Sequence, residues 1–320
     1  MKNSSKPRIV FFGTPELAIP TLARLVEDFE VVAVVTRPDR TRGRNRRNLE
    51  ACPVKEFAQE KNIPVLQPCQ HTEEGFREAM VELDADVFCV LAFGMIMPQW
   101  LIDTPACGCF NAHTSLLPHL RGAAPINWAI IRGDEKTGVS VQRMVKKLDA
   151  GPVVWQRELA IDAKETTASL SEKLAAIIPQ AMFETVHAAF DGSLEETIQD
   201  EEKVTYAPLL SKETGLIDWS KSAEEIDRLV RGCIPWPVAY TYLQDNYLKI
   251  WDCNIIKGVD NDPGEVVACS TKQGIIVACG TDALEIKVCQ KQNHKRLDSA
   301  AFLCGSKLDV GFRFDSKEKN

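Results

Sequence analysis

Short apolar runs recur through the first half of the chain and alternate with segments of helical periodicity. Residues 9–12, 31–35 and 87–91 carry no charged or hydroxyl-bearing side chain. Strands of this composition are buried on both faces, as in a parallel sheet covered by helices on both sides. The alternation therefore predicts an α/β fold built on a parallel sheet. The expected strands are residues 8–13, 30–36, 65–66, 86–91, 107–111, 138–144 and 153–161.

Between these runs, apolar side chains recur with the spacing of a helix surface. The clearest pattern covers residues 15–27, where Thr14 is placed to cap the helix and Pro15 stands in its first turn. The other helices expected in this half are residues 54–61, 73–83 and 167–189.

The composition of the sequence changes after residue 191. Residues 192–207 are polar and rich in acidic side chains, and we expect them to form a linker. A helix is expected at 223–231, and short β runs then recur about every ten residues, which is typical of a small barrel. These runs are residues 239–243, 247–253, 264–268, 274–278 and 284–288. We therefore expect a first domain over 1–191, a linker over 192–207 and a second domain over 208–320.

Charge and cysteine content restrict the class of protein. The 320 residues include 38 basic and 45 acidic side chains, so a nucleic-acid site would have to be a local patch. No stretch approaches the roughly 20 apolar residues of a membrane span, and the start lacks a secretory signal, so we expect a cytoplasmic protein. The eleven cysteines are scattered without a Cys-x-x-Cys pair. We expect small buried thiols rather than a zinc site or a disulfide framework.

Polar side chains that are able to take part in catalysis lie at the end of the apolar strand at 107–111 and after it. Asn111 and His113 are two residues apart, so both lie on one face at the edge of the sheet where open α/β folds bind ligands. An amide and an imidazole placed together can stabilise an oxyanion and move a proton. Asp149, in the turn 148–151, is placed to orient the imidazole. From position alone, an ordinary loop histidine and an ordinary turn remain open alternatives.

An arginine-rich island follows the second predicted strand. Residues 37–47 contain six arginines and one acid in an otherwise acidic chain. Guanidinium groups pair bidentately with phosphate, so phosphate binding is the favoured interpretation, and a solubilising loop is the alternative. Residues 13–15 form neither a Gly-x-Gly-x-x-Gly nor a Walker loop, so neither NAD nor ATP is predicted.

These motifs together resemble the folate-dependent formyltransferases, and among them the methionyl-tRNA formyltransferases. The resemblance runs along nearly the whole chain. It is carried by residues 11–16, 36–40, 53–55, 92–98, 111–118, 121–126, 137–139, 148–151, 210–219 and 235–237.

The resemblance implies a Rossmann-like catalytic domain followed by a small, OB-like β-barrel that binds tRNA. It implies 10-formyltetrahydrofolate as formyl donor and methionyl-initiator tRNA as acceptor, in translation initiation, with no metal, no membrane and no obligate protein partner. The catalytic residues it implies are Asn111, His113 and Asp149. The folate-binding residues it implies are Phe93, Gly94, Met95, Ile96, Ser115, Leu116, Leu117 and Pro118. The tRNA-binding residues it implies are Arg40, Arg42, Arg44, Arg46 and Arg47.

Three other functions remain open at this point. A formyltransferase acting on a nucleotide-linked amino sugar would use the same three catalytic residues, and a formyl-folate hydrolase would use them without a tRNA-binding barrel. A non-catalytic RNA-binding protein would keep the fold alone. The arginine-rich island and the turn at 13–15 favour the tRNA substrate over the amino sugar.

Overall fold

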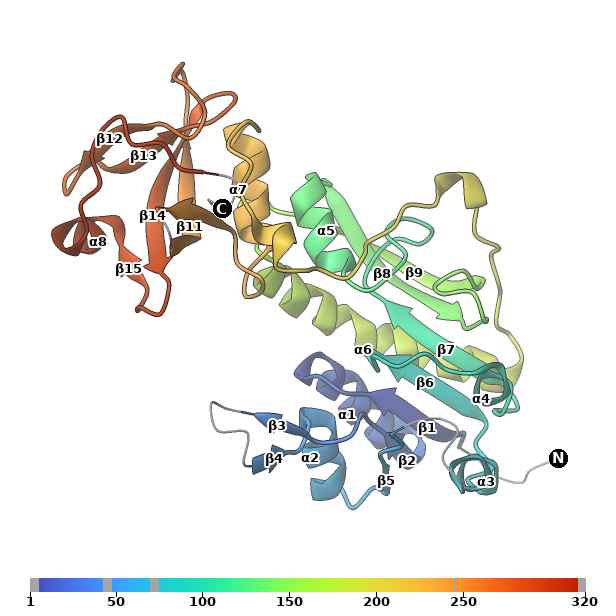
Figure 1. Ribbon diagram of the computed structural model, residues 1–320. Helices are drawn as coiled ribbons and strands as arrows, with labels where there is room; N and C mark the ends of the chain where they lie inside the picture. The colour runs from blue at the N-terminus through green and yellow to red at the C-terminus, as the bar shows by residue number, and fades with distance from the viewer. Residues whose placement is uncertain (1–5, 43–47, 70–74, 245, 316–320) are drawn as a thin grey trace. The chain divides into compact units, whose positions relative to one another are not determined.

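The computed structural model describes residues 6–42, 48–69, 75–244 and 246–315 (Figure 1). The chain forms two compact units. The first contains residues 1–122, 137–160 and 171–207, and the second contains 123–136, 161–170 and 208–320. Each unit consists of several separate segments of the chain, whereas the sequence analysis divided the chain into continuous domains. The domain boundaries at 191 and 207 therefore stay a prediction.

A seven-stranded sheet forms the core of the first unit, in the order β5-β2-β1-β6-β7-β8-β9. Each strand lies where the apolar runs predicted one, so the α/β fold is confirmed. Side chains of Phe11, Phe12, Phe88 and Phe110 are completely buried in it. The strands are β1 (Arg8–Gly13), β2 (Glu30–Val35), β5 (Val65–Leu66), β6 (Val87–Leu91), β7 (Gly108–His113), β8 (Lys136–Arg143) and β9 (Val153–Ala160).

Strand direction departs from the prediction at one edge of the sheet. β1 is parallel to β2 and β6, and β6 is parallel to β7, but β8 runs antiparallel to β7. The side chains of β8 are almost all buried, and burial on both faces does not distinguish the two directions. The expectation of a wholly parallel sheet is therefore wrong for β8.

The first predicted helix begins later than expected. A 3-10 turn (Glu16–Ala18) precedes α1 (Ile19–Asp28), and Thr14 does not cap it. The Thr14 hydroxyl instead donates to the carbonyl of Phe93 at 3.1 Å, which ties the end of β1 to the loop after β6. The other helices of this region are α2 (Pro53–Glu60), α3 (Phe76–Glu82), α4 (Gln99–Ile102), which was not predicted, and the long α6 (Thr167–Asp191), which Figure 1 shows running across the sheet.

The arginine-rich island contains a two-stranded hairpin that the sequence did not predict. β3 (Arg40–Arg42) pairs antiparallel with β4 (Asn48–Glu50), and residues 43–47 lie outside the described residues. Asp39 anchors its base, because it accepts hydrogen bonds from Gln67 and Lys55 at 2.8 and 2.6 Å. Those two bonds lower the pKa of Asp39.

An antiparallel sheet forms the second unit, which confirms the predicted C-terminal β domain. Trp219 lies in its core, where the indole N–H donates to Thr241 Oγ1 at 2.9 Å and the ring stacks on Phe314. The strands follow the order β10-β11-β14-β13-β12, with β15 beside β14. They are β10 (Tyr240–Leu243), β11 (Asn246–Ile256), β12 (Val266–Ser270), β13 (Gly274–Ala278), β14 (Ala283–Lys291) and β15 (Leu297–Asp298).

Among the described residues, the α-helices that lie wholly in the second unit are α5 (Pro125–Arg132), α7 (Ala223–Gly232) and α8 (Ser299–Gly305). Only α7 was predicted. It starts with a capping box, in which Ser222 and Glu225 exchange side-chain and backbone hydrogen bonds. No helix among the described residues is both long and apolar enough to cross a membrane.

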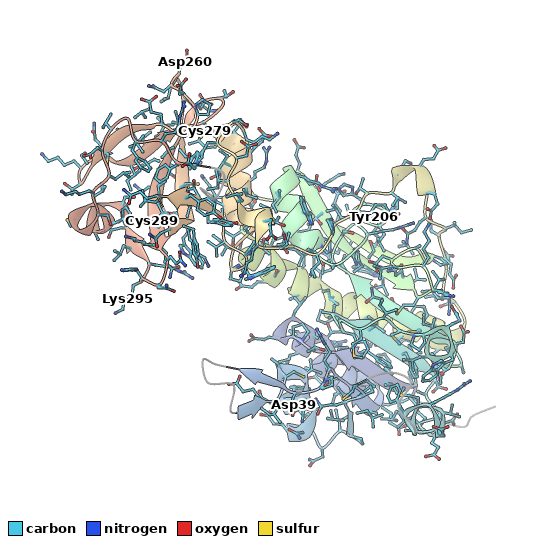
Figure 2. All side chains as sticks on the ribbon, in the orientation of Figure 1. Asp39, Tyr206, Asp260, Cys279, Cys289 and Lys295 are labelled. Atoms are coloured by element: carbon cyan, nitrogen blue, oxygen red, sulfur yellow. The ribbon has the colours of Figure 1, made fainter. Side chains whose placement is uncertain are left out.

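None of the eleven cysteines, all of which lie among the described residues, forms a disulfide. Six are buried, as predicted, whereas Cys69 and Cys304 are exposed and the other three are half-buried. Cys279 and Cys289 lie among the strands of the second unit (Figure 2). Burial raises the pKa of Cys233, Cys279 and Cys289 to about 12, so these thiols stay protonated at neutral pH.

We predict that the six buried cysteines resist a thiol-labelling reagent in the folded protein at pH 8. The thiolate is the reactive form, and burial disfavours both access and ionisation. Labelling followed by mass spectrometry should place the fast label on Cys69 and Cys304. The buried thiols should react only after denaturant is added, and rapid native labelling of Cys89 or Cys289 would contradict the structure.

Candidate active site

The carboxyl ends of three neighbouring strands meet at one edge of the first unit's sheet. Gly13 at the end of β1 pairs with Leu91 at the end of β6, and Val90 pairs with Asn111 of β7. β1 has β2 on one side and β6 on the other, so the strand order reverses here. Open α/β sheets bind ligands in the crevice outside such a reversal.

Asn111 and His113 share one face of β7, as the sequence predicted. On the neighbouring strand β8, Gln142 pairs with Asn111 and Ser140 pairs with His113. Directly opposed residues project to the same face of a sheet, so four polar side chains gather here. His113, Gln142 and Ser140 are buried, and Asn111 is half-buried.

Two contacts fix the His113 ring. Its Nε2 lies 2.9 Å from the carbonyl oxygen of Leu120. A carbonyl only accepts hydrogen bonds, so Nε2 carries a proton in this arrangement. The other nitrogen, Nδ1, faces Oδ2 of Asp149 at 3.8 Å. This distance is too long for a direct hydrogen bond and suits an ion pair or a bridging water.

The Asp149 carboxylate is held at both oxygens by uncharged donors. The side-chain amide of Gln142 donates to Oδ1 at 2.9 Å, and the backbone N–H of Gly122 donates to Oδ2 at 2.9 Å. The backbone of Asp149 itself has φ +50°, in the left-handed region. The carboxylate is thus aimed at His113 by a turn with an uncommon conformation.

Two glutamines hold the turn that carries Asp149, and sequence reasoning missed both. The Gln142 amide oxygen accepts the N–H of Gly151 at 3.1 Å. From the other side, the Gln199 amide donates to the carbonyls of Asp149 and Gly151 at 2.9 and 2.7 Å. A polar side chain inside an apolar strand was the available signal for Gln142. No signal marks Gln199, which lies in the polar stretch expected to be a linker.

Residues 115–118 are fastened to β8 and β9. Ser140 Oγ donates to the Ser115 carbonyl at 2.6 Å and accepts the N–H of Leu117 at 3.0 Å. The Gln156 amide donates to Ser140 Oγ and to the Leu117 carbonyl. Ser115 and Leu117 are buried, so Leu116 and Pro118 are the half-buried members of this predicted group.

The loop after β6 presents backbone groups at the same sheet edge. Phe93 is buried against Phe12, whereas Ile96 is 88% exposed. Gly94 has φ +75°, and a Cβ there would lie 3.3 Å from the Arg37 guanidinium. Within the described residues, no backbone-to-backbone hydrogen bond uses an N–H or C=O group of residues 94–97. Gly94 and Ile96 of this loop are exposed, Met95 is half-buried and Met97 is buried.

The positions of the predicted tRNA-binding arginines and of possible metal ligands can also be given. Arg40 and Arg42 lie in β3, and Arg44, Arg46 and Arg47 lie outside the described residues. In the part of the chain that the structure describes, no group of three or more His, Cys, Asp or Glu side chains is placed to hold a metal ion.

We predict that Gly151→Ala lowers the free energy of unfolding by about 1–3 kcal/mol, as overpacking of a tight site does. A Cβ at residue 151 would collide with the carbonyl oxygen of Arg143. Gly305→Ala is the matched control, because nothing lies near its Cβ position. Chemical denaturation of both variants tests the prediction, and equal stability of the two would contradict it.

Comparison with known proteins agrees with this geometry. A family model described as "Formyl transferase" matches residues 8–186, and one described as "Formyl transferase, C-terminal domain" matches residues 209–307.

Solved structures show the same fold at low sequence identity. HypX from Aquifex aeolicus in complex with tetrahydrofolic acid superposes with a TM-score of 0.61 at 18% identity, over 96% of this chain and 51% of HypX. This chain therefore spans about half the length of HypX. An N-formyltransferase from Helicobacter canadensis, bound to folinic acid and dTDP-3-aminofucose, gives a TM-score of 0.64 at 15% identity, over 87% of this chain and 98% of that one.

Sequence relatives are much more similar. The methionyl-tRNA formyltransferase of Bacillus licheniformis is 44% identical over 311 residues, covering 96% of this chain and 97% of the relative. That of Bacillus subtilis is 44% identical over 309 residues, covering 95% and 96%. With identity at this level along nearly the full length of both proteins, the chain belongs to the methionyl-tRNA formyltransferase family.

Proposed function

We propose that this chain transfers the formyl group of 10-formyltetrahydrofolate to the α-amine of methionyl-initiator tRNA, in the cytoplasm and at the start of translation. The observation that carries the proposal is the set Asn111, His113 and Asp149 at one sheet edge, in a chain of this family. An amide, an imidazole and a carboxylate are the groups that acyl transfer to an amine needs.

The reaction forms one bond from nitrogen to the formyl carbon and breaks another. The neutral α-amine of the methionyl ester attacks the formyl carbon, and the carbonyl oxygen becomes an oxyanion. The Asn111 amide donates a hydrogen bond to that oxygen. The bond to N10 of the folate then breaks, and the products are formylmethionyl-tRNA and tetrahydrofolate.

His113 and Asp149 supply the proton path. The amine must lose a proton and N10 must gain one, so a group that can both accept and donate is required. Nε2 of His113 donates to the Leu120 carbonyl, which leaves Nδ1, facing Asp149, as the ring nitrogen that can accept and give up a proton. A water between Nδ1 and the carboxylate would carry the proton from the attacking amine to the departing N10.

The loop 92–98 fits the folate. A pterin ring has hydrogen-bond donors and acceptors along one edge, which backbone N–H and C=O groups can match. Residues 94–97 offer such groups beside the strand end that carries Asn111. The predicted folate residues Phe93, Gly94, Met95 and Ile96 belong to this loop. Leu116 and Pro118 are the half-buried positions of the predicted 115–118 group.

Two cationic elements suit the tRNA. One is the β3–β4 hairpin with its arginines. The other is the aromatic face of the second unit, which we define as the outward side chains Tyr240, Tyr242, Tyr247, Lys249 and Trp251 of β10 and β11. All five are half-buried and alternate with buried residues.

Cations surround the aromatic face. Arg296 stacks on Trp251, and Lys295 lies at the turn between β14 and β15 (Figure 2). Lys249, Lys295 and Arg296 form no ion pair with any described residue. Aromatic rings among unpaired cations are typical of surfaces that bind nucleic-acid strands. This face is where we place the tRNA contacts of the predicted domain 208–320.

The experiment that tests the function is a formyl-transfer assay with 10-formyltetrahydrofolate. Methionyl-initiator tRNA and a nucleotide-linked 4-amino sugar are offered together. Formyl on the tRNA is the expected result. Formyl on the sugar, consumption of the folate without transfer, or tRNA binding without turnover would instead indicate an amino-sugar enzyme, a hydrolase or a binding protein.

We predict that Asn111→Ala lowers kcat by about 10²–10³-fold, the loss seen when one oxyanion donor is removed. His113→Ala should lower kcat by a similar factor. The affinity for methionyl-tRNA, measured by filter binding, should change little, because neither side chain is assigned a tRNA contact. A loss below tenfold in kcat would remove the assigned roles.

We predict that Lys249→Ala with Arg296→Ala, and separately Arg42→Ala with Arg44→Ala, raise the KM for tRNA and flatten its dependence on salt. Each lost phosphate contact removes about one counterion from the salt slope. Lys257→Ala is the matched control, because Lys257 is paired with Glu224 and Asp282 at 2.9 and 3.1 Å. An unchanged slope in either double variant would exclude that element from tRNA binding.

A further inference from the structure

Residues 120–122 connect to both His113 and Asp149. The Leu120 carbonyl accepts from His113 Nε2, and the Gly122 N–H donates to Asp149 Oδ2. These three residues therefore set the orientation of the imidazole and of the carboxylate at once.

The segment around Tyr206 holds residues 120–122 in place. The Arg121 N–H donates to the Thr205 carbonyl at 2.9 Å, and the Ala207 N–H donates to the Arg121 carbonyl at 2.7 Å. The Thr205 hydroxyl accepts the N–H of Leu120 at 2.8 Å. The stretch 192–207, expected to be a linker, thus supports the site from outside the sheet.

Gln199 extends this support to Asp149. Its amide nitrogen donates to the carbonyls of Asp149 and Gly151, and its amide oxygen accepts from Nε and Nη2 of Arg121 at 3.0 and 2.8 Å. Both donors and both lone pairs of the amide are used. We call Arg121, Gln199 and the two carbonyls the Gln199 clamp.

The clamp is not simply a stabilising contact. Arg121 is 1% exposed, and its Nη1 is buried without a hydrogen-bond partner among the described residues. A buried cation with an unpaired nitrogen lowers stability. Its charged partner among the described residues, Glu201, is exposed and shared with Lys147. The arrangement therefore holds the Asp149 turn at the cost of a buried, incompletely paired cation.

The Asp149 turn needs such a hold. A non-glycine residue with positive φ is strained and persists only where its surroundings fix it. Gln142 holds the carboxylate of this turn, and Gln199 holds its backbone. Without Gln199, the two carbonyls would lose their donor, and the backbone could relax away from His113.

We propose that Gln199, fixed by Arg121, is a positioning residue for formyl transfer, which keeps the Asp149 carboxylate opposite Nδ1 of His113. This inference rests on the proposed function for its kinetic test. It assigns no substrate contact to Gln199 or Arg121.

Gln199→Met removes the hydrogen bonds and keeps the volume. We expect kcat to fall by about 10–100-fold, with the KM for tRNA and for the folate within about threefold of wild type, because a positioning contact acts on the chemical step. Gln180→Met, on the exposed surface of α6, is the matched control and should behave as wild type.

A double-mutant cycle separates positioning from a general loss of structure. If Gln199 acts through Asp149, Gln199→Met should have almost no further effect on kcat once Asp149→Ala is present. The same fold-loss in both backgrounds would overturn the proposal.

Gln199→Glu covers the case in which the Met variant does not fold. A carboxylate still accepts both hydrogen bonds from Arg121 but cannot donate to the carbonyls of Asp149 and Gly151. We expect a folded protein with lowered kcat, and wild-type kcat in this variant would overturn the proposal.

Hydrogen exchange tests the clamp without substrates. The Gly151 N–H, protected by Gln142, should exchange faster in Gln199→Met than in Gln180→Met. Unchanged exchange would overturn the clamp, whereas failure of the wild-type protein to formylate methionyl-tRNA would overturn only the proposed function.

Discussion

The in-register parallel pairing of β6 with β7 is the constraint on which the site depends. Val90 opposite Asn111 brings the loop after β6 next to the polar end of β7. The pairing forms because both strands are apolar enough to be buried on both faces. A shift by one residue would turn Asn111 and His113 to the opposite face of the sheet.

The polar side chains buried at this edge of the sheet need hydrogen-bond partners. An unpaired polar group in the interior costs more than a hydrogen bond contributes, so each buried group needs a partner. Gln142 and Gly122 satisfy the Asp149 carboxylate with uncharged donors. Both donors are uncharged, so among the described residues the charged side chain that faces this carboxylate can only be that of His113 when its ring is protonated.

The sequence predicted the strands of both units well, because apolar runs bounded by turn residues determine them. It could not predict the direction of β8 or the β3–β4 hairpin, since both depend on pairing partners rather than on local composition. Asn111, His113 and Asp149 were predicted as site residues from spacing and family resemblance. The structure places Asn111 and His113 on one face of β7 and Asp149 3.8 Å from His113. Gln199 was out of reach, because a glutamine in a polar stretch has no local signal and acts only through contacts distant in sequence.

The hydrogen bonds of residues 199–207 also determine where the chain can be divided without loss of contacts to the candidate site. Composition changes near residue 191, and a fragment ending there would contain Asn111, His113 and Asp149 but neither Gln199 nor Thr205. Residues 199–207, which precede the last segment of the second unit, form hydrogen bonds with Arg121 and Asp149 of the candidate site. An exchange of residues 208–320 between relatives, joined after Ala207, would keep these hydrogen bonds, but it would separate 208–320 from 123–136 and 161–170 of the same compact unit.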